Sequence, residues 1–224
     1  SEVYIMIPKI IHQLWVGPKP APMELMNTWK DSHPDWEYMI WNEETLKEHF
    51  PNGLHNQTQY DAMPEWNGKC DIARYEILQK FGGFFLDADC VCLRPLDDYL
   101  LDNDSFSCYE NEYIRGQLIA AGYLGCTPKN ELMWHLVNKL HNLHGQSLWQ
   151  GNMTAWKTVG PLFLTQTIHE LKYNKIAVYP SFYFIPNHYT KLHPYTGPFK
   201  PYADQFWGST ETPQGKVGMD YEKV

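Results

Sequence analysis

The sequence has no long apolar run, no cluster of basic residues and few cysteines. A helix that crosses a membrane needs about 20 consecutive apolar residues, and the apolar runs here are only a few residues long. The 224 residues carry a net charge of −8, and a phosphate-backbone partner requires clustered Lys and Arg. We therefore expect neither a membrane segment in this sequence nor nucleic acid as the main ligand.

The five cysteines are odd in number and form no Cys-x-x-Cys pair. Such a set is typical of buried thiols in a reducing compartment and not of a disulfide framework. The length and the 43% hydrophobic content suit one large core and hardly two. We expect one domain over residues 1–210, followed by a polar and mobile tail over residues 211–224.

Strand and helix patterns alternate along the chain. We predict strands from Ile7 to Val16 and from Trp36 to Trp41, and a helix from Trp66 to Phe81 that stops at Gly82. Residues 51–61 are expected to form a polar loop. Shorter patterns continue the alternation, with strands near 106–109, 117–124 and 176–178 and helices over 130–143 and 161–171. This order predicts an α/β fold.

Two aspartates, Asp87 and Asp89, follow a glycine pair and an apolar strand. Residues i and i+2 of an extended chain point to the same side, so both carboxylates can approach one point where the strand ends. Ligands of open α/β sheets gather outside the carboxyl ends of strands. Paired carboxylates suit Mn²⁺ or Mg²⁺, which keep positions open for phosphate oxygens. The plainer interpretation is a turn or cap pair.

Two further groups surround this strand. Asp71 and Arg74 lie three residues apart on one face of the preceding helix. The carboxylate suits ribose hydroxyls and the arginine suits an aspartate or a phosphate, whereas the alternative is a weak local ion pair. At the exit of the first strand, Trp15 is a candidate for stacking on a nucleobase, with a core position as the equal alternative.

These motifs stand in the order in which they occur in a known family. They are Ile7-Pro8-Lys9-Ile10-Ile11-His12-Gln13-Leu14-Trp15, Pro34-Asp35-Trp36-Glu37-Tyr38 leading to Trp41, Asp71-Ile72-Ala73-Arg74-Tyr75, and Gly82-Gly83-Phe84-Phe85-Leu86-Asp87-Ala88-Asp89. The chain resembles the Asp-x-Asp sugar transferases, which include the yeast initiating α-1,6-mannosyltransferase, bacterial polysaccharide transferases and glycosyltransferases of large DNA viruses. The resemblance implies the type-A glycosyltransferase fold, a single domain with a Rossmann-like, mixed and mostly parallel sheet flanked by helices.

The resemblance also implies roles for individual residues. Asp89 is expected to bind Mn²⁺ (or Mg²⁺) directly, and Asp87 to contact ribose and a metal-bound water. We count Asp71, Asp87 and Asp89 as catalytic. The residues expected to bind the nucleotide sugar are His12, Gln13, Leu14, Trp15, Asp71, Arg74, Gly83, Asp87, Ala88, Asp89, Trp207 and Ser209.

The C-terminal region departs from the family pattern. Many relatives carry a histidine before a segment that closes over the diphosphate, and Gln205 stands at that position here. We expect the metal ligands to come from Asp87, Asp89, Asp204 and Gln205. Ser209 is a further candidate for the third protein ligand, and the choice stays open.

We therefore predict a metal-dependent glycosyltransferase that moves a hexose-type sugar from a nucleotide sugar, UDP-linked in preference to GDP-linked, to a hydroxyl of a glycan or glycoconjugate. Polysaccharide biosynthesis and protein glycosylation are the expected settings. The resemblance favours retention of configuration, and for inversion Glu110, Glu112 and Asp204 are candidate bases. The alternatives are a metal-dependent sugar-binding module and an Asp-x-Asp phosphatase. We favour the cytoplasm, or the Golgi lumen if an N-terminal anchor was removed.

Overall fold

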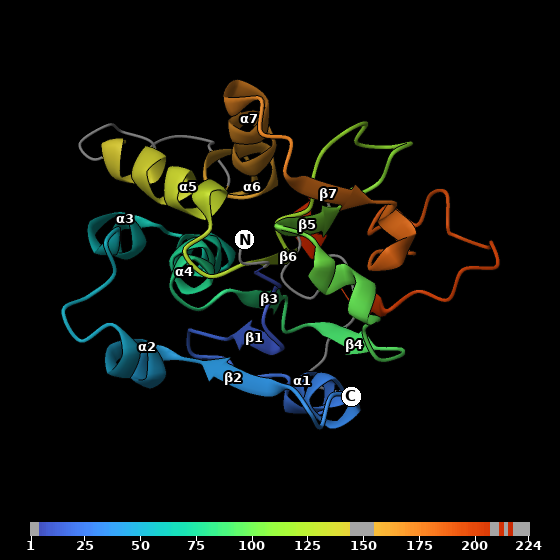
Figure 1. The fold of residues 1–224 in the computed structure, drawn as a ribbon, viewed down its shortest axis with the longest axis horizontal. Helices are drawn as coiled ribbons and strands as arrows, with labels where there is room; N and C mark the ends of the chain where they lie inside the picture. The colour runs from blue at the N-terminus through green and yellow to red at the C-terminus, as the bar shows by residue number, and fades with distance from the viewer. Residues whose placement is uncertain (1–4, 144–154, 207–210, 213–214, 217–224) are drawn as a thin grey trace.

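A six-stranded sheet with helices on both faces forms the centre of the computed structural model, which describes residues 5–143, 155–206, 211–212 and 215–216 (Figure 1). In sheet order the strands are β2 (Glu37–Trp41), β1 (Ile10–Leu14), β3 (Gly83–Leu86), β6 (Tyr123–Cys126), β5 (Ser105–Cys108) and β7 (Ile176–Tyr179). Neighbouring strands are parallel except around β6, which is antiparallel to β3 and β5. The predicted α/β fold with a mixed, mostly parallel sheet is confirmed.

Consecutive residues of β3 face two different cores. Phe85 belongs to a core built with α4 (Trp66–Phe81), α5 (Glu131–Asn142) and α7 (Pro161–Leu171), which the short helices α2 (Glu43–His49), α3 (Gln57–Ala62) and α6 (Ala155–Thr158) border. Phe84 belongs to the core under α1 (Met23–Ser32), the 3₁₀ turns η1 (Asp98–Asp102) and η2 (Ser181–Tyr183), and the chain near 184–203. Side chains of a strand alternate between faces, so β3 is buried on both.

Two glycines make the connection from α4 to β3 possible. Gly82 has φ +65° and Gly83 has φ +100°, and both values are strained for any other residue. A Cβ atom at Gly82 would lie 2.6 Å from the nitrogen of Pro128, and one at Gly83 would lie 2.7 Å from the carbonyl oxygen of Ile10. The glycine pair therefore ends the helix, as predicted, and lets β3 enter the sheet directly beside β1.

Two short two-stranded sheets lie outside the central sheet. Strand β4 (Cys90–Cys92) pairs antiparallel with β8 (Ala203–Gln205), which brings the C-terminal region to the residues that follow Asp89. Strand β9 (Glu211–Thr212) pairs with β10 (Gly215–Lys216). The other residues of the predicted tail lie outside the described part of the chain, so the domain boundary at residue 210 stays a prediction. None of the described helices is both long and apolar enough to cross a bilayer.

Several predicted elements differ from the structure. The first strand runs from Ile10 to Leu14 and not from Ile7 to Val16, and Pro8, near the predicted start, has no N–H to donate to the sheet. The strand predicted over 117–124 is continuous only from Tyr123, because the chain bends at residues 121–122; before the bend, Ile119 forms an isolated bridge with Tyr109. The expected loop at 51–61 contains most of α3, whose polar sequence hid the helix.

Candidate active site

Asp87 lies at the edge of the sheet where β1 and β3 end and β6 begins. Its backbone N–H donates to the carbonyl oxygen of Gly122 at 3.0 Å. Its carbonyl oxygen accepts from Gln13 Nε2 at 3.1 Å, and Gln13 Oε1 in turn accepts from the Tyr38 hydroxyl at 2.7 Å. Both sides of the Asp87 residue are therefore fixed by neighbouring strands, which aims its side chain away from the sheet.

Arg74 is the centre of an ion network in the middle of α4. Its guanidinium donates to Asp71 Oδ1 at 2.9 Å and to Asp87 Oδ1 at 2.7 Å, and it also donates to the carbonyl oxygen of Ala121. Only 2% of the Arg74 side chain is exposed. Burial raises the pKa of Asp71 to about 7 and also raises the pKa of Asp87, while Arg74 opposes both shifts. The buried cation therefore offsets only part of the cost of burying these two carboxylates, and both keep a raised pKa.

Gly122 leaves the space that the Asp87 carboxylate occupies. A Cβ atom at Gly122 would lie 2.4 Å from Asp87 Oδ2 and 2.9 Å from its Cγ. The carboxylate cannot turn away freely, because Arg74 holds its other oxygen at 2.7 Å. Glycine is thus required at this position because a side chain would collide with Asp87, and not because of the backbone conformation.

We expect Gly122→Ala to weaken manganese-dependent nucleotide binding at least about tenfold, because the added methyl group displaces a carboxylate of the site. Calorimetry with Mn²⁺ and a nucleoside diphosphate measures the effect. Gly125→Ala is the matched control three residues further along the chain, since its Cβ would strike Phe106 in the core instead of Asp87. The control is expected to lose stability and keep binding; wild-type binding by Gly122→Ala would contradict the steric role.

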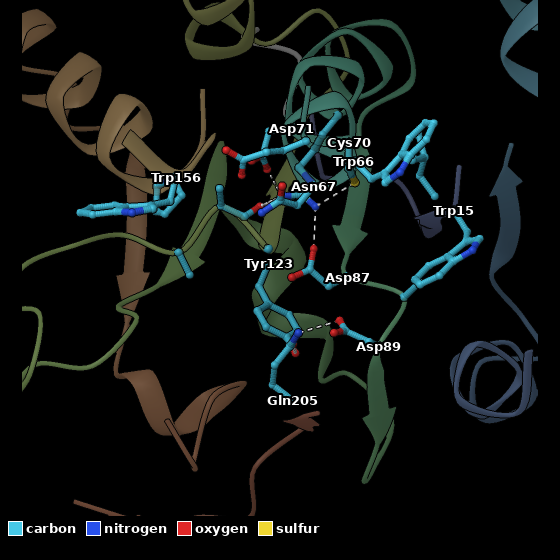
Figure 2. A pocket seen from close by; sticks show the side chains of 18 of the residues that line it. Trp15, Trp66, Asn67, Cys70, Asp71, Asp87, Asp89, Tyr123, Trp156 and Gln205 are labelled. Carbon is cyan, nitrogen blue, oxygen red and sulfur yellow. Dashed lines mark hydrogen bonds and ion pairs between the residues drawn. The ribbon is translucent and has the colours of Figure 1, made fainter. Parts of the chain in front are cut away.

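Asp89 is held by a short relay of buried side chains. Gln205 Nε2 donates to Asp89 Oδ1 at 2.7 Å, and the Tyr123 hydroxyl donates to Gln205 Oε1 at 2.6 Å. Figure 2 shows Asp87, Asp89 and Gln205 gathered at the floor of one cleft. The structure thus brings Gln205, predicted from the sequence, to Asp89, with the NH₂ group of the amide toward the carboxylate.

The other C-terminal candidates have different positions. Asp204 precedes Gln205 on β8 and therefore points to the other side of that strand; its carboxylate accepts from Asn187 Nδ2 at 3.3 Å and does not line the cleft. Trp207 and Ser209 lie outside the described residues. Their contacts with a nucleotide sugar stay predictions.

The residues predicted at the exit of the first strand divide into two pairs. Leu14 and Trp15 line the cleft, as does Ala88. His12 and Gln13 are fully buried behind it. His12 Nε2 donates to Gly82 O at 2.8 Å, and its Nδ1 accepts from Trp41 Nε1 at 3.1 Å, so the ring is neutral and supports the glycine connection.

Burial lowers the pKa of His12 to about 4 from 6.5. The folded pKa of His12 lies below the unfolded one. Its neutral form therefore contributes fully to the free energy of unfolding above about pH 6.5, and about 3 kcal/mol of this contribution is lost as the pH falls toward 4. We expect His12→Gln to flatten the decline of the unfolding free energy over this pH interval. Urea titrations of both proteins measure it, and parallel declines would refute the assignment.

The cleft has a volume of about 680 Å³ and two walls of different composition. One wall carries Trp15, Trp66 and Asn67, and Trp156 lies on the opposite side, with the two aspartates between them (Figure 2). The aromatic rings of the first wall suit a base, and the carboxylate of Asp71, which also lines the cleft, suits a ribose. Sequence reasoning missed Trp66, Gly122, Tyr123 and Trp156, which no spacing relates to the aspartates.

The residues at the floor fit a hard divalent cation. Asp87 and Asp89 supply carboxylate groups, and Gly122 keeps the space beside Asp87 Oδ2 clear. Gln205 turns its NH₂ group to Asp89 and its Oε1 to the Tyr123 hydroxyl, so it orients Asp89, and its predicted role as a metal ligand stays a prediction. Among the described residues, no cluster of three or more His, Cys, Asp or Glu forms a complete ligand cage. Mg²⁺ and Mn²⁺ are commonly held by one or two carboxylates while phosphate oxygens and water fill the other positions.

The three candidate bases are also separated by the structure. Glu110 lines the cleft and accepts from His188 Nε2 at 3.1 Å. Glu112 instead accepts from the N–H and the hydroxyl of Ser181, at 2.7 and 2.8 Å. Of the predicted bases, Glu110 is therefore the one that the described cleft contains.

The comparisons with known proteins agree with this geometry. A family model described as "Glycosyltransferase sugar-binding region containing DXD motif" matches residues 21–107, which include both aspartates. The chain is 42% identical over 101 residues to inositol phosphoceramide mannosyltransferase 3 of Schizosaccharomyces pombe, covering 42% of this chain and 27% of the relative. It is 27% identical over 203 residues to mannosyl phosphorylinositol ceramide synthase SUR1 of Saccharomyces cerevisiae, covering 85% of this chain and 49% of the relative.

Among solved structures, the chain is similar to the PaToxG glycosyltransferase, with a TM-score of 0.58 and 16% identity over 75% of this chain and 70% of the other. The fold is thus the type-A glycosyltransferase fold. The resemblance to the Asp-x-Asp sugar transferases, among them mannosyltransferases of yeasts, is confirmed. The chain spans half or less of the length of these yeast relatives.

Proposed function

We propose that this domain transfers a hexose from a nucleoside diphosphate sugar to a hydroxyl of a glycan or glycoconjugate, and that Mn²⁺ or Mg²⁺ is required. The supporting observation is the meeting of Asp87 and Asp89 with the Asp71–Arg74 pair at the floor of one cleft. A bound divalent cation neutralises the charge that develops on a departing diphosphate. Asp87 and Asp89 are the residues that we propose to hold it, and Gln205 orients the Asp89 carboxylate.

The residues that line the cleft support separate binding sites for the base and for the ribose. Trp15 and Trp66 offer ring faces for the base, and Asp71, which also lines the cleft, offers a carboxylate for the ribose hydroxyls. Residues on both walls exclude water from the floor, so that an acceptor hydroxyl replaces water as the attacking group.

The identities of the transferred sugar, the acceptor and the nucleotide are further parts of the proposal. Relatives named mannosyltransferases favour mannose as the transferred hexose and make an inositol-containing glycoconjugate the first acceptor to test. The preference for uridine over guanosine, retention of configuration and a cytoplasmic or Golgi location stay predictions. Polysaccharide biosynthesis and protein glycosylation stay open as settings.

The test is a transfer assay with UDP- and GDP-linked mannose and glucose, with Mn²⁺ or with a chelator. With Mn²⁺ we expect release of a nucleoside diphosphate and formation of a glycosylated acceptor. With the chelator we expect neither product. Sugar binding without turnover would support the binding module instead. Release of inorganic phosphate without glycosylation would support the phosphatase. Either result overturns the proposal.

A further inference from the structure

Glu110 is joined to the floor of the cleft by a short backbone segment, residues 118–122. It lies just after β5, and its N–H donates to the carbonyl oxygen of Leu118 at 2.9 Å. At the other end of this segment, the carbonyl oxygen of Gly122 accepts from the N–H of Asp87 at 3.0 Å. Leu118 and Gly122 line the same cleft as Glu110. The segment therefore places the Glu110 carboxylate in the cleft that holds both aspartates.

One oxygen of the Glu110 carboxylate is held by a buried histidine. The side chain of His188 has no exposed surface, and that of Glu110 is only 14% exposed. The distance from His188 Nε2 to Glu110 Oε1 is 3.1 Å. Since both side chains are withdrawn from water, this hydrogen bond fixes the carboxylate more firmly than an exposed one would.

The contacts of the second ring nitrogen show where the proton of His188 lies. Thr190 Oγ1 accepts from the N–H of Leu192 at 3.4 Å and lies 3.0 Å from His188 Nδ1. The N–H of Thr190 also donates to Nδ1, at 3.4 Å. A ring nitrogen that accepts a backbone N–H carries no proton, so the ring is neutral and its proton lies on Nε2. His188 therefore donates to Glu110.

The second oxygen of Glu110 keeps its capacity to accept a hydrogen bond. Among the hydrogen bonds between described residues, Oε1 accepts from His188 and Oε2 accepts none. Arg115 also approaches Oε1, but the distance from its Nε is 3.9 Å, which exceeds a hydrogen bond. Both oxygens of an ionised carboxylate accept. Glu110 thus offers one acceptor atom to a hydroxyl group in the cleft.

We propose that Glu110 is a catalytic residue whose Oε2 accepts a hydrogen bond from the hydroxyl that attacks the donor sugar, and that His188 is its positioning residue. This hydrogen bond directs a lone pair of the attacking oxygen at the sugar and stabilises the positive charge that the oxygen gains. The role requires no proton transfer to Glu110, so it is compatible with retention and with inversion. The inference rests on the proposed function and adds the residues that orient the attacking group.

Glu110→Gln is the direct test. The amide oxygen still accepts from His188, whereas the NH₂ group takes the place of Oε2 and donates instead of accepting. Turnover is measured as release of nucleoside diphosphate from UDP- and GDP-linked mannose and glucose with Mn²⁺, in the transfer assay and also without acceptor, where water attacks. We expect kcat to fall roughly 10- to 100-fold, the range for a hydrogen bond to a charged group. The donor KM and the nucleotide affinity from calorimetry should stay within about twofold.

Glu112→Gln is the matched control for this substitution. Glu112 is a carboxylate of the same loop, but it accepts from the N–H and the hydroxyl of Ser181 and does not line the cleft. We expect its kcat to equal that of the wild-type protein within about twofold, as for a substitution away from the site.

The positioning role of His188 is tested by two substitutions. His188→Leu removes the donor that holds Glu110 Oε1, so kcat should fall roughly tenfold or more while nucleotide affinity stays within about twofold. His188→Gln keeps an N–H donor and should restore kcat to within about threefold of the wild-type value. A purely structural hydrogen bond predicts instead that both variants lose thermal stability and keep the wild-type kcat per folded molecule. If His188→Leu does not fold, kcat of Glu110→Gln decides the proposal.

The outcomes separate the inference from the proposed function. A wild-type kcat in Glu110→Gln, or a loss of nucleotide affinity in that variant, overturns the role of Glu110 and leaves the glycosyltransferase proposal standing. A wild-type kcat in His188→Leu overturns the positioning role. If the wild-type protein neither transfers nor hydrolyses any of these donors with Mn²⁺, the proposed function itself fails.

Discussion

Asp89→Asn is expected to abolish manganese-dependent nucleotide binding and to lower kcat/KM for transfer by about a thousandfold or more. Charge stabilisation of a leaving group by a bound cation is worth several kcal/mol, and about 1.4 kcal/mol corresponds to a factor of ten in rate. The amide keeps an oxygen for the hydrogen bond from Gln205, which is 2.7 Å long in the native protein, so the fold should be preserved. Steady-state kinetics and calorimetry measure the two effects.

Asp204→Asn is the matched control for this substitution. Asp204 precedes Gln205 on β8, but its carboxylate bonds to Asn187 and lies outside the cleft. We expect metal-dependent binding to change by less than about threefold, as for a substitution away from the site. If Asp204→Asn removed binding and Asp89→Asn did not, the assignment of the metal ligands would be reversed.

Arg74→Leu is expected to destabilise the protein by about 3–5 kcal/mol, which is the cost of removing one partner of a buried ion pair. The substitution leaves the buried Asp71 carboxylate and the Asp87 carboxylate, whose side chain is 34% exposed, without a counter-charge. Since both pKa values are already raised by burial, their carboxylates will protonate more readily without the cation. The loss of stability should therefore be smaller at about pH 5 than at about pH 8, which urea titrations at the two pH values measure.

Lys9→Met provides the comparison at the surface. Lys9 also contacts two carboxylates, Asp35 at 3.2 Å and Asp98 at 3.6 Å, but its side chain is 42% exposed. Solvent screens exposed ion pairs, which therefore contribute little to stability, so a small effect is expected. If the two substitutions lowered the free energy of unfolding equally, burial of the Arg74 network would not be the source of its stabilising effect.

The path from α4 to Asp87 was predictable because its signals are local. Helical spacing, the stop at Gly82 and the apolar strand each depend on neighbouring residues, and the structure contains all of them. The i+3 spacing of Asp71 and Arg74 likewise predicted an ion pair, and the structure shows it. That Arg74 also binds Asp87 follows from how α4 packs beside the end of β3, which spacing along the chain does not reveal.

The rest of the site depends on contacts between distant segments. Strand β4 meets β8 across more than 100 residues of sequence, so only the resemblance to a family pointed to Gln205. Gly122 has no sequence signal, because its importance comes from the Asp87 carboxylate that occupies the place of its side chain. Trp156 and Arg115 meet through the packing of α6 near the loop before β6. Such positions become visible only when the strands are placed in sheet order.

Calorimetric titration of the wild-type protein with UDP and with GDP, with Mn²⁺ and then with a chelator, tests the central claim most directly. The claim is that the floor of the cleft, with Asp87 and Asp89, binds a nucleoside diphosphate through a divalent cation. We expect at least one nucleotide to bind with Mn²⁺ and its affinity to fall at least about tenfold with the chelator. Affinity that is the same with and without Mn²⁺, or no binding of either nucleotide, would contradict the account.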